Sequence, residues 1–577
     1  MNNLHSLIKS CGSGFARFVW PVLLRWFPLF LLLTTAYQEI FYMHREVYDY
    51  ESISWTMVGA NHLMMVWDAC FITLLVALFP VKRARWICVP LFLLIFYCVG
   101  NALYARNIYG YMPLRAWLEY QNLHGLGGSI FYNLHLIDWI TILYVVAVMV
   151  GSFFFRPRMP RYKERIPVLV VLLVGLTAWH LGLTRSMADN DEEWKRAEFS
   201  VEDFVWSRET YIFSHGMFWS GVQEIVSSNV KLELSSDEKG EIQDYLLRPP
   251  FKHHLEKPRN IVLVVVESLI TDPVDLWVDS VEVTPTLNRL KREGIFAPNM
   301  RSEVRYGESS DGQFIYFTGL LPKTSGITIF DNLDNHYKGI GTAAKAAGYQ
   351  TILLNATGRN FWRKNETCPK YGLDNHYAPD SYSEMIDPMV GDQTWLNDEQ
   401  IFNFAYHLLK KHQEAPSFMA VLTLSTHTPY SKEFDLSREH FTSVENEMYR
   451  CYLEKANYMD YHLGQFIQKV DADSTLQDAA IVVVSDHSAP EKFDFETLRP
   501  IPLFIYGRGI QPEQLDNELR QIDVYPTLLN MMGYDHLPYM GMGHSVYDMD
   551  STYTAPAADN SQRVANLIIR GDYFKEE

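Results

Sequence analysis

Four side chains that can bind a metal ion follow apolar runs that lie far apart in the sequence. Glu267 ends NIVLVVVES, His427 follows SFMAVLTLSTH, and Asp486 with His487 ends AAIVVVSDHS. Nearly continuous apolar runs of this length are typical of strands in a parallel sheet that is covered on both faces. Ligands of such sheets bind outside the carboxyl ends of the strands. A single Glu or His after a strand is usually a cap or a surface residue, but four together predict one site at one edge.

A hydroxyl for this site could come from the segment VRYGESSDGQFIYFTGLL, where a polar turn runs into an apolar, helix-like stretch. A helix N-terminus offers free N–H groups and a positive dipole end to a phosphate. A serine at this point could therefore both attack and hold a phosphoryl group. Ser-Ser-Asp before a helix is also a common N-cap, and the two roles are compatible for adjacent residues. The residues alone leave Ser309 and Ser310 open as the nucleophile.

The elements that must position these side chains belong to the polar part of the chain. From 256 onward, the runs NIVLVVVES, YQTILLNATG, SFMAVLTLSTH, AAIVVVSDHS and IPLFIYG alternate with segments of helical period. This alternation predicts an α/β domain with a central, mostly parallel sheet over 256–550. Residues 551–577 are expected to form a C-terminal tail.

The first third of the chain is a predicted membrane domain, residues 1–184. Five apolar runs each come close to the roughly twenty residues that a spanning helix needs, at 18–43, 60–80, 86–105, 131–155 and 166–184. The basic loops 82–85 and 156–165 should be cytoplasmic by the positive-inside rule, which places everything after the fifth span outside. The first span lacks a cleavage site behind a short apolar core, which predicts an uncleaved anchor.

Residues 185–255 form a predicted juxtamembrane linker, acidic and rich in aromatic residues. Its aromatic side chains could lie at the headgroup level of a bilayer or pack on the following domain. The formal net charge of −18 argues against a nucleic-acid partner. Only Cys368 and Cys451 fall in the polar part of the chain, so at most one disulfide could form there, and the sequence leaves open whether it does.

In its motifs and their order, the chain resembles the lipoteichoic acid synthase-like phosphoglycerol transferases of the alkaline phosphatase/sulfatase superfamily. The resemblance covers nearly the whole chain and includes the five-span anchor. The motifs that carry it are LVVVESL, TPTLNRLKREGIFAPN, GESSDGQF, AAKAAGYQTILL, STHTPY, VVVSDHS and QIDVYPTLLNMMG. Each motif is weak by itself, but together they are specific.

The resemblance implies that Glu267, Asp486 and His487 bind one divalent metal ion, with Ser309 as nucleophile and fourth ligand. His427 would contact the substrate phosphate or assist the leaving group. Mn is the metal that the resemblance favours, while an oxygen-rich ligand set of this kind also suits Mg or Zn.

The family's reactive hydroxyl stands two residues before an Asp, here Asp311, which favours Ser309 over Ser310. The family usually has Thr at this position, and serine keeps the hydroxyl. In NATGRNFWRKN, the resemblance assigns Trp362 and either Arg363 or Lys364 to the substrate.

The implied function is transfer of a phosphoglycerol group from a phospholipid headgroup to a glycan, glycolipid or polymer acceptor through a phospho-serine intermediate. The protein would be a multi-pass protein of the bacterial inner membrane with an extracytoplasmic catalytic domain. A phosphoethanolamine transferase acting on a glycolipid is the alternative, although those enzymes commonly carry several disulfides. A sulfatase is disfavoured because the Cys/Ser-x-Pro-x-Arg signature is missing at Ser309. An alternative of another class is a non-catalytic, lipid-binding regulatory membrane protein.

Overall fold

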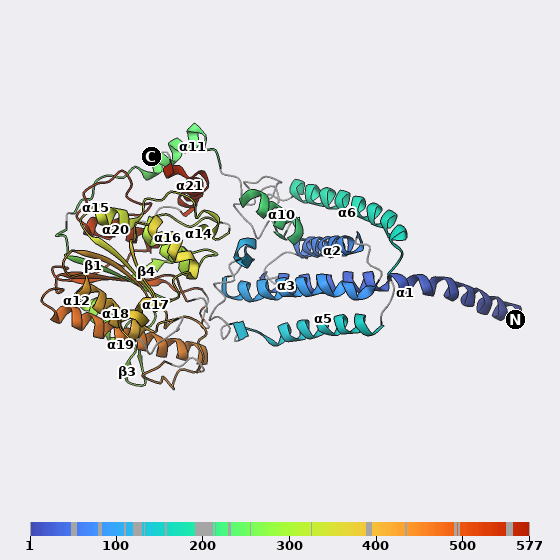
Figure 1. Cartoon of the computed structure of the whole chain (residues 1–577), viewed down its shortest axis with the longest axis horizontal. Coiled ribbons are helices and arrows are strands. Elements are labelled where there is room, and N and C mark those ends of the chain that lie inside the picture. Colours follow the sequence, from blue (N-terminus) through green and yellow to red (C-terminus); the bar gives the residue numbers. More distant parts are fainter. Residues whose placement is uncertain are drawn as a thin grey trace. The chain divides into compact units, whose positions relative to one another are not determined.

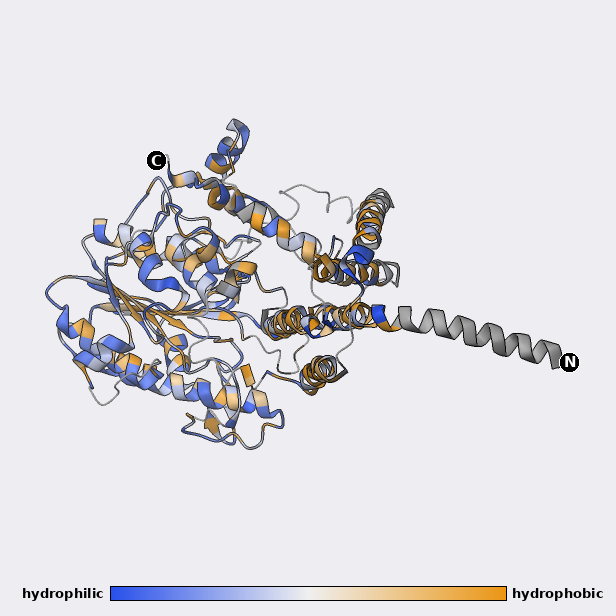
Figure 2. Cartoon of the chain, turned by 45° about the vertical axis from the view of Figure 1, so that its right-hand side comes forward, coloured by the Kyte–Doolittle hydropathy of each residue, from blue (hydrophilic) through white to orange (hydrophobic). Residues whose placement is uncertain are grey.

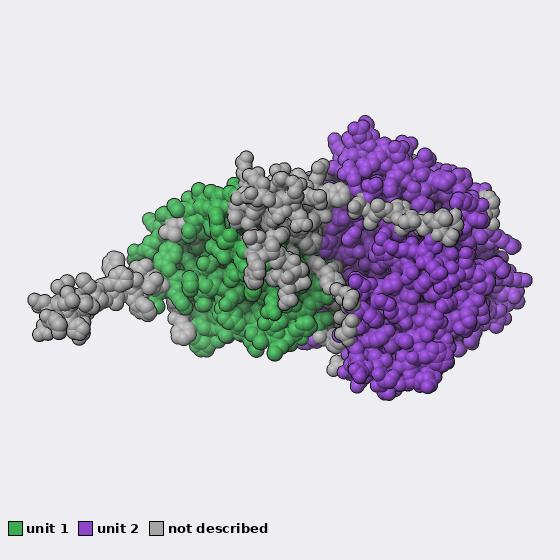
Figure 3. Space-filling model, turned by 180° about the vertical axis from the view of Figure 1, so that it is seen from behind, with its two compact units in different colours: residues 1–114, 133–230 green, residues 115–132, 231–577 purple. Residues whose placement is uncertain are grey.

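The computed structural model divides the chain into two compact units (Figure 3). Unit 1 comprises residues 1–114 and 133–230, and unit 2 comprises residues 115–132 and 231–577. The structure describes residues 2–47, 55–78, 83–108, 111–118, 130–131, 133–155, 159–190, 212–213, 215–228, 232–253, 255–324, 326–387, 395–432, 436–489, 493, 495, 497–549 and 558–575.

Unit 1 is built from helices (Figure 1), and Figure 2 shows that apolar residues dominate those that follow α1. Long helices pack side by side, α1 against α2, α3 and α5, and α2 against α6. Their bounds are α1 Asn2–Val47, α2 Trp55–Leu78, α3 Cys88–Ile108, α5 Leu136–Phe155 and α6 Tyr162–Asn190, and they are followed by the shorter α10 Met217–Ser228.

Four of these helices are long and apolar enough to cross a membrane, at 61–78, 84–106, 136–154 and 162–182. They correspond to the second to fifth predicted spans. The first predicted span, 18–43, lies within α1, which is helical throughout but does not meet the same criteria in the described residues. The helical membrane domain is therefore confirmed, with four spans identified where five were expected.

Buried charge in unit 1 is paired where three helices meet. Arg106 of α3 donates to Asp138 of α5 from both terminal nitrogens at 2.7 Å and to Glu46 of α1 from Nε at 2.8 Å. The hydroxyl of Tyr42 also donates to Asp138. A buried charge is stable only when it is paired. The network therefore holds α1, α3 and α5 in contact at these residues.

Unit 2 is an α/β domain around one mixed sheet in the strand order β10-β4-β9-β8-β1-β7-β5-β6, with β11 also pairing β4. β9 is the antiparallel member between β8 and β4, and the other pairings in this sheet are parallel. The predicted central, mostly parallel sheet is confirmed. The strands are β1 Asn260–Val266, β4 Ile295–Arg301, β5 Gln350–Asn355, β6 Asn375–Tyr377, β7 Ser417–Leu422, β8 Ala479–Ser485, β9 Ile501–Gly507, β10 Glu513–Gln514 and β11 Leu519–Arg520.

Helices cover both faces of this sheet, as the sequence of its central strands requires (Figure 1). β1, β7 and β8 are buried at every residue, which leaves no face for water. One layer contains α12 Pro285–Glu293, α18 Asp398–Lys411 and α19 Glu447–Ala472, and the other contains α14 Thr328–Asp331, α15 Ile340–Ala346, α16 Lys364–Lys370 and α20 Val524–Met531. Next to these lies α13, Ser309–Thr318, which packs on α20.

The C-terminal residues join unit 2 through helix α21, Ala558–Gly571, which packs against α11, Ser236–Leu246. The predicted tail thus contains a packed helix. Cys368 and Cys451 are both buried free thiols, so they do not pair with each other. Of the predicted linker, residues 191–211 lie outside the described residues.

Candidate active site

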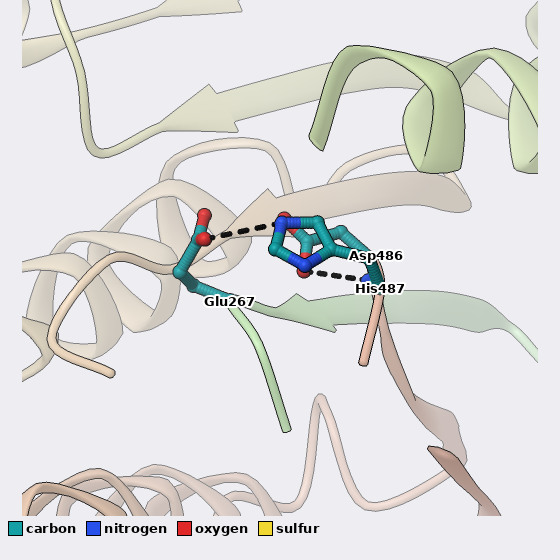
Figure 4. A group of neighbouring side chains, drawn as sticks. All are labelled: Glu267, Asp486 and His487. Carbon is teal, nitrogen blue, oxygen red and sulfur yellow. Dashed lines mark hydrogen bonds and ion pairs between the residues drawn. The ribbon is translucent and has the colours of Figure 1, made fainter. Parts of the chain in front are cut away.

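Three of the predicted metal ligands meet at the carboxyl end of the sheet. β1 and β8 pair in parallel with Val266 opposite Ser485, so the residues that follow the two strands are neighbours. One ligand atom from each of Glu267, Asp486 and His487 lies within 4.8 Å of the others, and all three residues are buried. Figure 4 shows Glu267 facing the His487 imidazole, with Asp486 beside it.

Hydrogen bonds fix these side chains from behind. Asp486 Oδ1 accepts from the backbone N–H groups of Ser268 at 2.9 Å and His487 at 2.8 Å, which leaves Oδ2 on the side of the imidazole. Glu267 Oε1 accepts from the Ser268 hydroxyl at 3.0 Å. On the far side of the imidazole, His487 Nδ1 lies 2.8 Å from the Ser488 carbonyl oxygen. This bond makes Nδ1 the donor and turns Nε2 toward the carboxylates.

Ser309 brings its hydroxyl to the same point from the first residue of α13. Its Oγ lies 3.2 Å from His487 Nε2 and 3.3 Å from Glu267 Oε2. The hydroxyl of Ser310 points elsewhere, donating to the Gly307 carbonyl at 2.7 Å. The geometry thus separates the two serines that the residue pattern left open, and it favours Ser309.

Asp311 and nearby glycines determine the conformation of the turn before α13. Asp311 Oδ2 accepts from the backbone N–H groups of Arg305 at 2.9 Å and Gly307 at 3.0 Å. A Cβ at Gly312 would lie 2.1 Å from the Asp486 carbonyl oxygen. Glycine at this position therefore lets α13 approach the end of β8 closely enough for Ser309 to reach His487.

One residue of this site, Glu308, was not predicted from the sequence. Its Oε2 lies 3.5 Å from His487 Nδ1, and its backbone has a φ of +42°. The signal available in the sequence was its place directly before the candidate nucleophile. A lone Glu in a polar turn gives no reason to expect contact with a histidine that lies far away in the sequence.

Buried negative charge dominates the electrostatics of the cluster, so a positively charged partner would stabilise it. Burial, together with the charge of Glu267, raises the pKa of Asp486 to about 8, and burial raises the pKa of Glu308 to about 7. Burial alone would lower the pKa of His487, but the charges of Asp486, Glu308 and Glu267 hold it well above its usual range. Burial opposes ionisation of Glu267, yet hydrogen bonding to His487 and the charges of both nearby histidines lower its pKa.

The residues present fit a divalent cation. Two carboxylates, one imidazole and one hydroxyl form a compact, oxygen-rich set, and their backbone supports leave oxygen and nitrogen atoms directed at a common point. Because the two buried carboxylates repel each other, a bound cation would relieve the cost of their burial.

His427 lies beside this cluster but is not one of the three grouped residues. Its charge acts on Glu267, and the hydroxyl of the preceding Thr426 donates to the Glu267 carbonyl. His427 Nδ1 lies 2.5 Å from the Thr428 carbonyl oxygen, and its own carbonyl accepts from Lys455 at 2.9 Å. The bond to the Thr428 carbonyl makes Nδ1 the donor, so Nε2 is the nitrogen available to a ligand.

The structure separates the two basic residues next to Trp362. Trp362 and Arg363 both have positive φ, 53° and 51°, and Trp362 stacks on Phe330 at 5.4 Å between ring centroids. Arg363 pairs with Glu366 at 3.2 Å and is about a third exposed. Lys364 is buried, and the cluster carboxylates Glu267 and Asp486 act on its charge.

Burial lowers the pKa of Lys364 to about 8, while those same carboxylates oppose this shift. Its ammonium donates to the Phe361 carbonyl at 3.4 Å. Lys364 is thus the buried one of the two basic residues, and its ammonium interacts electrostatically with the cluster carboxylates.

The site thus combines a buried carboxylate–histidine cluster at the end of a doubly covered, mostly parallel sheet with a serine at a helix N-terminus. Residues 259–534 of this domain match the model of the Sulfatase family.

The relatives extend the similarity over both parts of the chain. Lipoteichoic acid synthase of Staphylococcus saprophyticus is 23% identical over 508 residues, which are 83% of this chain and 77% of that protein. Lipoteichoic acid synthase 2 of Bacillus subtilis is 23% identical over 496 residues, 81% of this chain and 74% of that protein. Similarity to lipoteichoic acid synthases and to enzymes of the sulfatase superfamily is therefore confirmed.

Among solved structures, the integral membrane protein lipooligosaccharide phosphoethanolamine transferase A (EptA) from Neisseria meningitidis has a similar fold. The TM-score is 0.56 at 13% identity, over 89% of this chain and 97% of that one. This likeness in fold covers the helical part as well as the α/β domain. The four candidate spans describe a membrane-anchored protein.

Proposed function

We propose that the protein is a metal-dependent transferase that moves a phosphoglycerol group from a phospholipid headgroup to a glycan or polymer acceptor. The observation that carries this proposal is the position of Ser309. Its hydroxyl lies within 3.3 Å of two of the three metal-competent side chains and at the N-terminus of α13. A serine in that position is a nucleophile for phosphoryl chemistry.

In the first half of the reaction, Ser309 Oγ loses its proton to solvent and attacks the phosphorus of the lipid phosphodiester. The P–O bond to the lipid alcohol breaks, and the alcohol leaves with a proton. In the second half, an acceptor hydroxyl oxygen attacks the phosphorus of the phospho-serine, the P–Oγ bond breaks, and Ser309 Oγ takes a proton back from solvent. His427 Nε2 supplies the proton to the leaving oxygen and takes one from the acceptor, because its Nδ1 is already held by Thr428.

Glu267, Asp486, His487 and Ser309 would hold one divalent ion, for which we favour Mn²⁺. Bound there, the ion supplies the positive charge that stabilises the deprotonated serine oxygen and the charge that develops on the phosphate.

Two further side chains hold the donor headgroup in this proposal. Lys364 binds the phosphate through its buried ammonium, and Trp362 packs against the headgroup carbons from its stacked position on Phe330. Arg363 stays outside, paired with Glu366.

The proposal places the protein in the bacterial inner membrane with unit 2 outside the cytoplasm, where lipid headgroups are within reach. The two relatives are named lipoteichoic acid synthases, which supports a phosphoglycerol group as cargo. The alternative cargo is phosphoethanolamine, as in the name of the EptA structure. The free thiols of Cys368 and Cys451 favour the first over the second, because disulfides are expected of the second.

The test uses the full-length protein in detergent with Mn²⁺ and radiolabelled phosphatidylglycerol or phosphatidylethanolamine. Release of diacylglycerol from phosphatidylglycerol alone is the expected result, and chelation should abolish it. Release from phosphatidylethanolamine alone would select the alternative cargo. Tight binding of lipid without turnover of either would favour the non-catalytic class instead.

A further inference from the structure

Glu308 is placed where it can act on the site through the imidazole of His487. The two nitrogens of His487 face different groups: Nε2 faces Glu267, Asp486 and Ser309, whereas Nδ1 faces the Ser488 carbonyl and Glu308. The Glu308 carboxylate therefore stands on the side of the imidazole that is opposite the cluster.

The backbone of Glu308 supports a functional reason for this placement. Its φ of 42° and ψ of −115° lie outside the conformations that a residue with a side chain adopts easily. Strain of this kind persists where the surroundings require it, and it concentrates at functional sites. A glycine would relieve the strain, but it would also remove the carboxylate.

Neighbouring carboxylates cannot replace Glu308 on this side of the ring. Glu267 and Asp486 approach Nε2 at 3.4 Å and 3.6 Å. Asp311 is turned away, accepting backbone N–H groups of its own turn. In the part of the chain that the structure describes, Glu308 is the carboxylate that approaches Nδ1.

We infer that Glu308 is a positioning residue that makes His487 a stronger and better oriented metal ligand. The inference rests on the proposed function. Ligating histidines usually direct their second nitrogen at a carbonyl or carboxylate, which fixes the tautomer and ring orientation and raises the basicity of the ligating nitrogen. Here the Ser488 carbonyl fixes the tautomer, and the Glu308 carboxylate adds negative charge behind the ring.

The same loop carries the nucleophile. Because Glu308 directly precedes Ser309, its contact with His487 also ties the first residue of α13 to the metal ligand that Ser309 faces. A lost contact would therefore weaken metal binding and loosen the nucleophile together.

The experiment measures Mn²⁺ affinity of the full-length protein in detergent by competition with a fluorescent chelator, together with thermal unfolding of the metal-free form. Glu308→Gln keeps the side-chain shape and removes its charge, and Glu308→Asp keeps the charge on a shorter side chain. The control is Glu303→Gln on the same loop, because Glu303 accepts from Arg520 at 2.7 Å and has no contact with His487.

We expect Glu308→Gln to weaken Mn²⁺ binding by about 10- to 100-fold relative to the wild type. Glu308→Asp should bind Mn²⁺ with an affinity between those two. Glu303→Gln should lower the unfolding temperature without changing the Mn²⁺ affinity. Unchanged affinity in Glu308→Gln, or equal losses in Glu308→Gln and Glu303→Gln, would overturn the inference while leaving the proposed function intact. A wild-type protein that binds no Mn²⁺ would overturn both.

Discussion

At the scale of single residues, the sequence predicts which side chains belong to the site, whereas the folded structure is needed to show where some of them point. Glu267, Asp486 and His487 could be predicted because each follows a strongly apolar run, and parallel strands end at one edge. The choices between Ser309 and Ser310, and between Arg363 and Lys364, depend on the direction of a side chain at a helix start or in a left-handed turn. No spacing rule provides that direction.

The two basic residues provide a matched pair for a substrate-binding test. We expect Lys364→Met to raise KM for the lipid donor by about 10-fold or more, because the buried ammonium would be replaced by an apolar group of similar length. Arg363→Met should change KM less than about threefold, since its guanidinium is partly exposed and already paired. Steady-state kinetics with phosphatidylglycerol in mixed micelles measures both. A larger effect of Arg363→Met would reverse the assignment.

At the scale of elements, the site depends on close contacts between segments that are distant in the sequence. Helix α13 touches the end of β8 at Gly312, and α19 reaches across to the start of α12 through Asp460. The sequence predicts the strands and the start of α13 but not these two contacts. Each contact joins segments whose relative position only the folded chain defines.

Gly312→Ala tests the contact between α13 and β8. A methyl group 2.1 Å from the Asp486 carbonyl must displace the nucleophile or the metal ligands, so we expect at least about a 100-fold loss of kcat and a lower unfolding temperature. The control, Gly240→Ala in α11, has open space at its Cβ and should be neutral or slightly stabilising. Equal activities for the two variants would show that the contact does not position the site.

Asp460 caps α12 from a different helix. Its carboxylate accepts from the N–H groups of Thr286 and Leu287 at 2.8 Å, and burial raises the pKa of Asp460 to about 7. A carboxyl group with a raised folded-state pKa favours folding below its ordinary pKa, and that contribution is lost as the pH rises through about 7.

The unfolding temperature of the wild type relative to Asp460→Asn should therefore be higher at about pH 5 than at about pH 8. Differential scanning fluorimetry of the full-length proteins measures this difference. A difference that does not change with pH would mean that Asp460 does not titrate in this range.

At the scale of the whole molecule, the chain combines an apolar helical unit with an α/β domain that matches the Sulfatase family, and the proposed function needs the second unit outside the cytoplasm. The positive-inside rule predicts this from the loops 82–85 and 156–165. Composition and charge could predict the two parts because a bilayer imposes length and polarity on a sequence.

Labelling of single introduced cysteines tests this orientation in intact cells. We expect a membrane-impermeant maleimide to label Ser474→Cys, on an exposed turn of unit 2, and to leave Lys163→Cys unlabelled until the cells are lysed. The wild-type protein provides the background from the native thiols. The reverse pattern would place the catalytic unit in the cytoplasm and contradict the proposed donor.

The central claim is that Ser309 carries the transferred group, and intact-mass analysis of the Mn²⁺-loaded full-length protein tests it most directly. After incubation with phosphatidylglycerol and without acceptor, we expect a mass increase of one phosphoglycerol group in the wild type and in Ser310→Ala, and none in Ser309→Ala. An adduct that persists in Ser309→Ala and disappears in Ser310→Ala would contradict the account, as would steady release of diacylglycerol by Ser309→Ala.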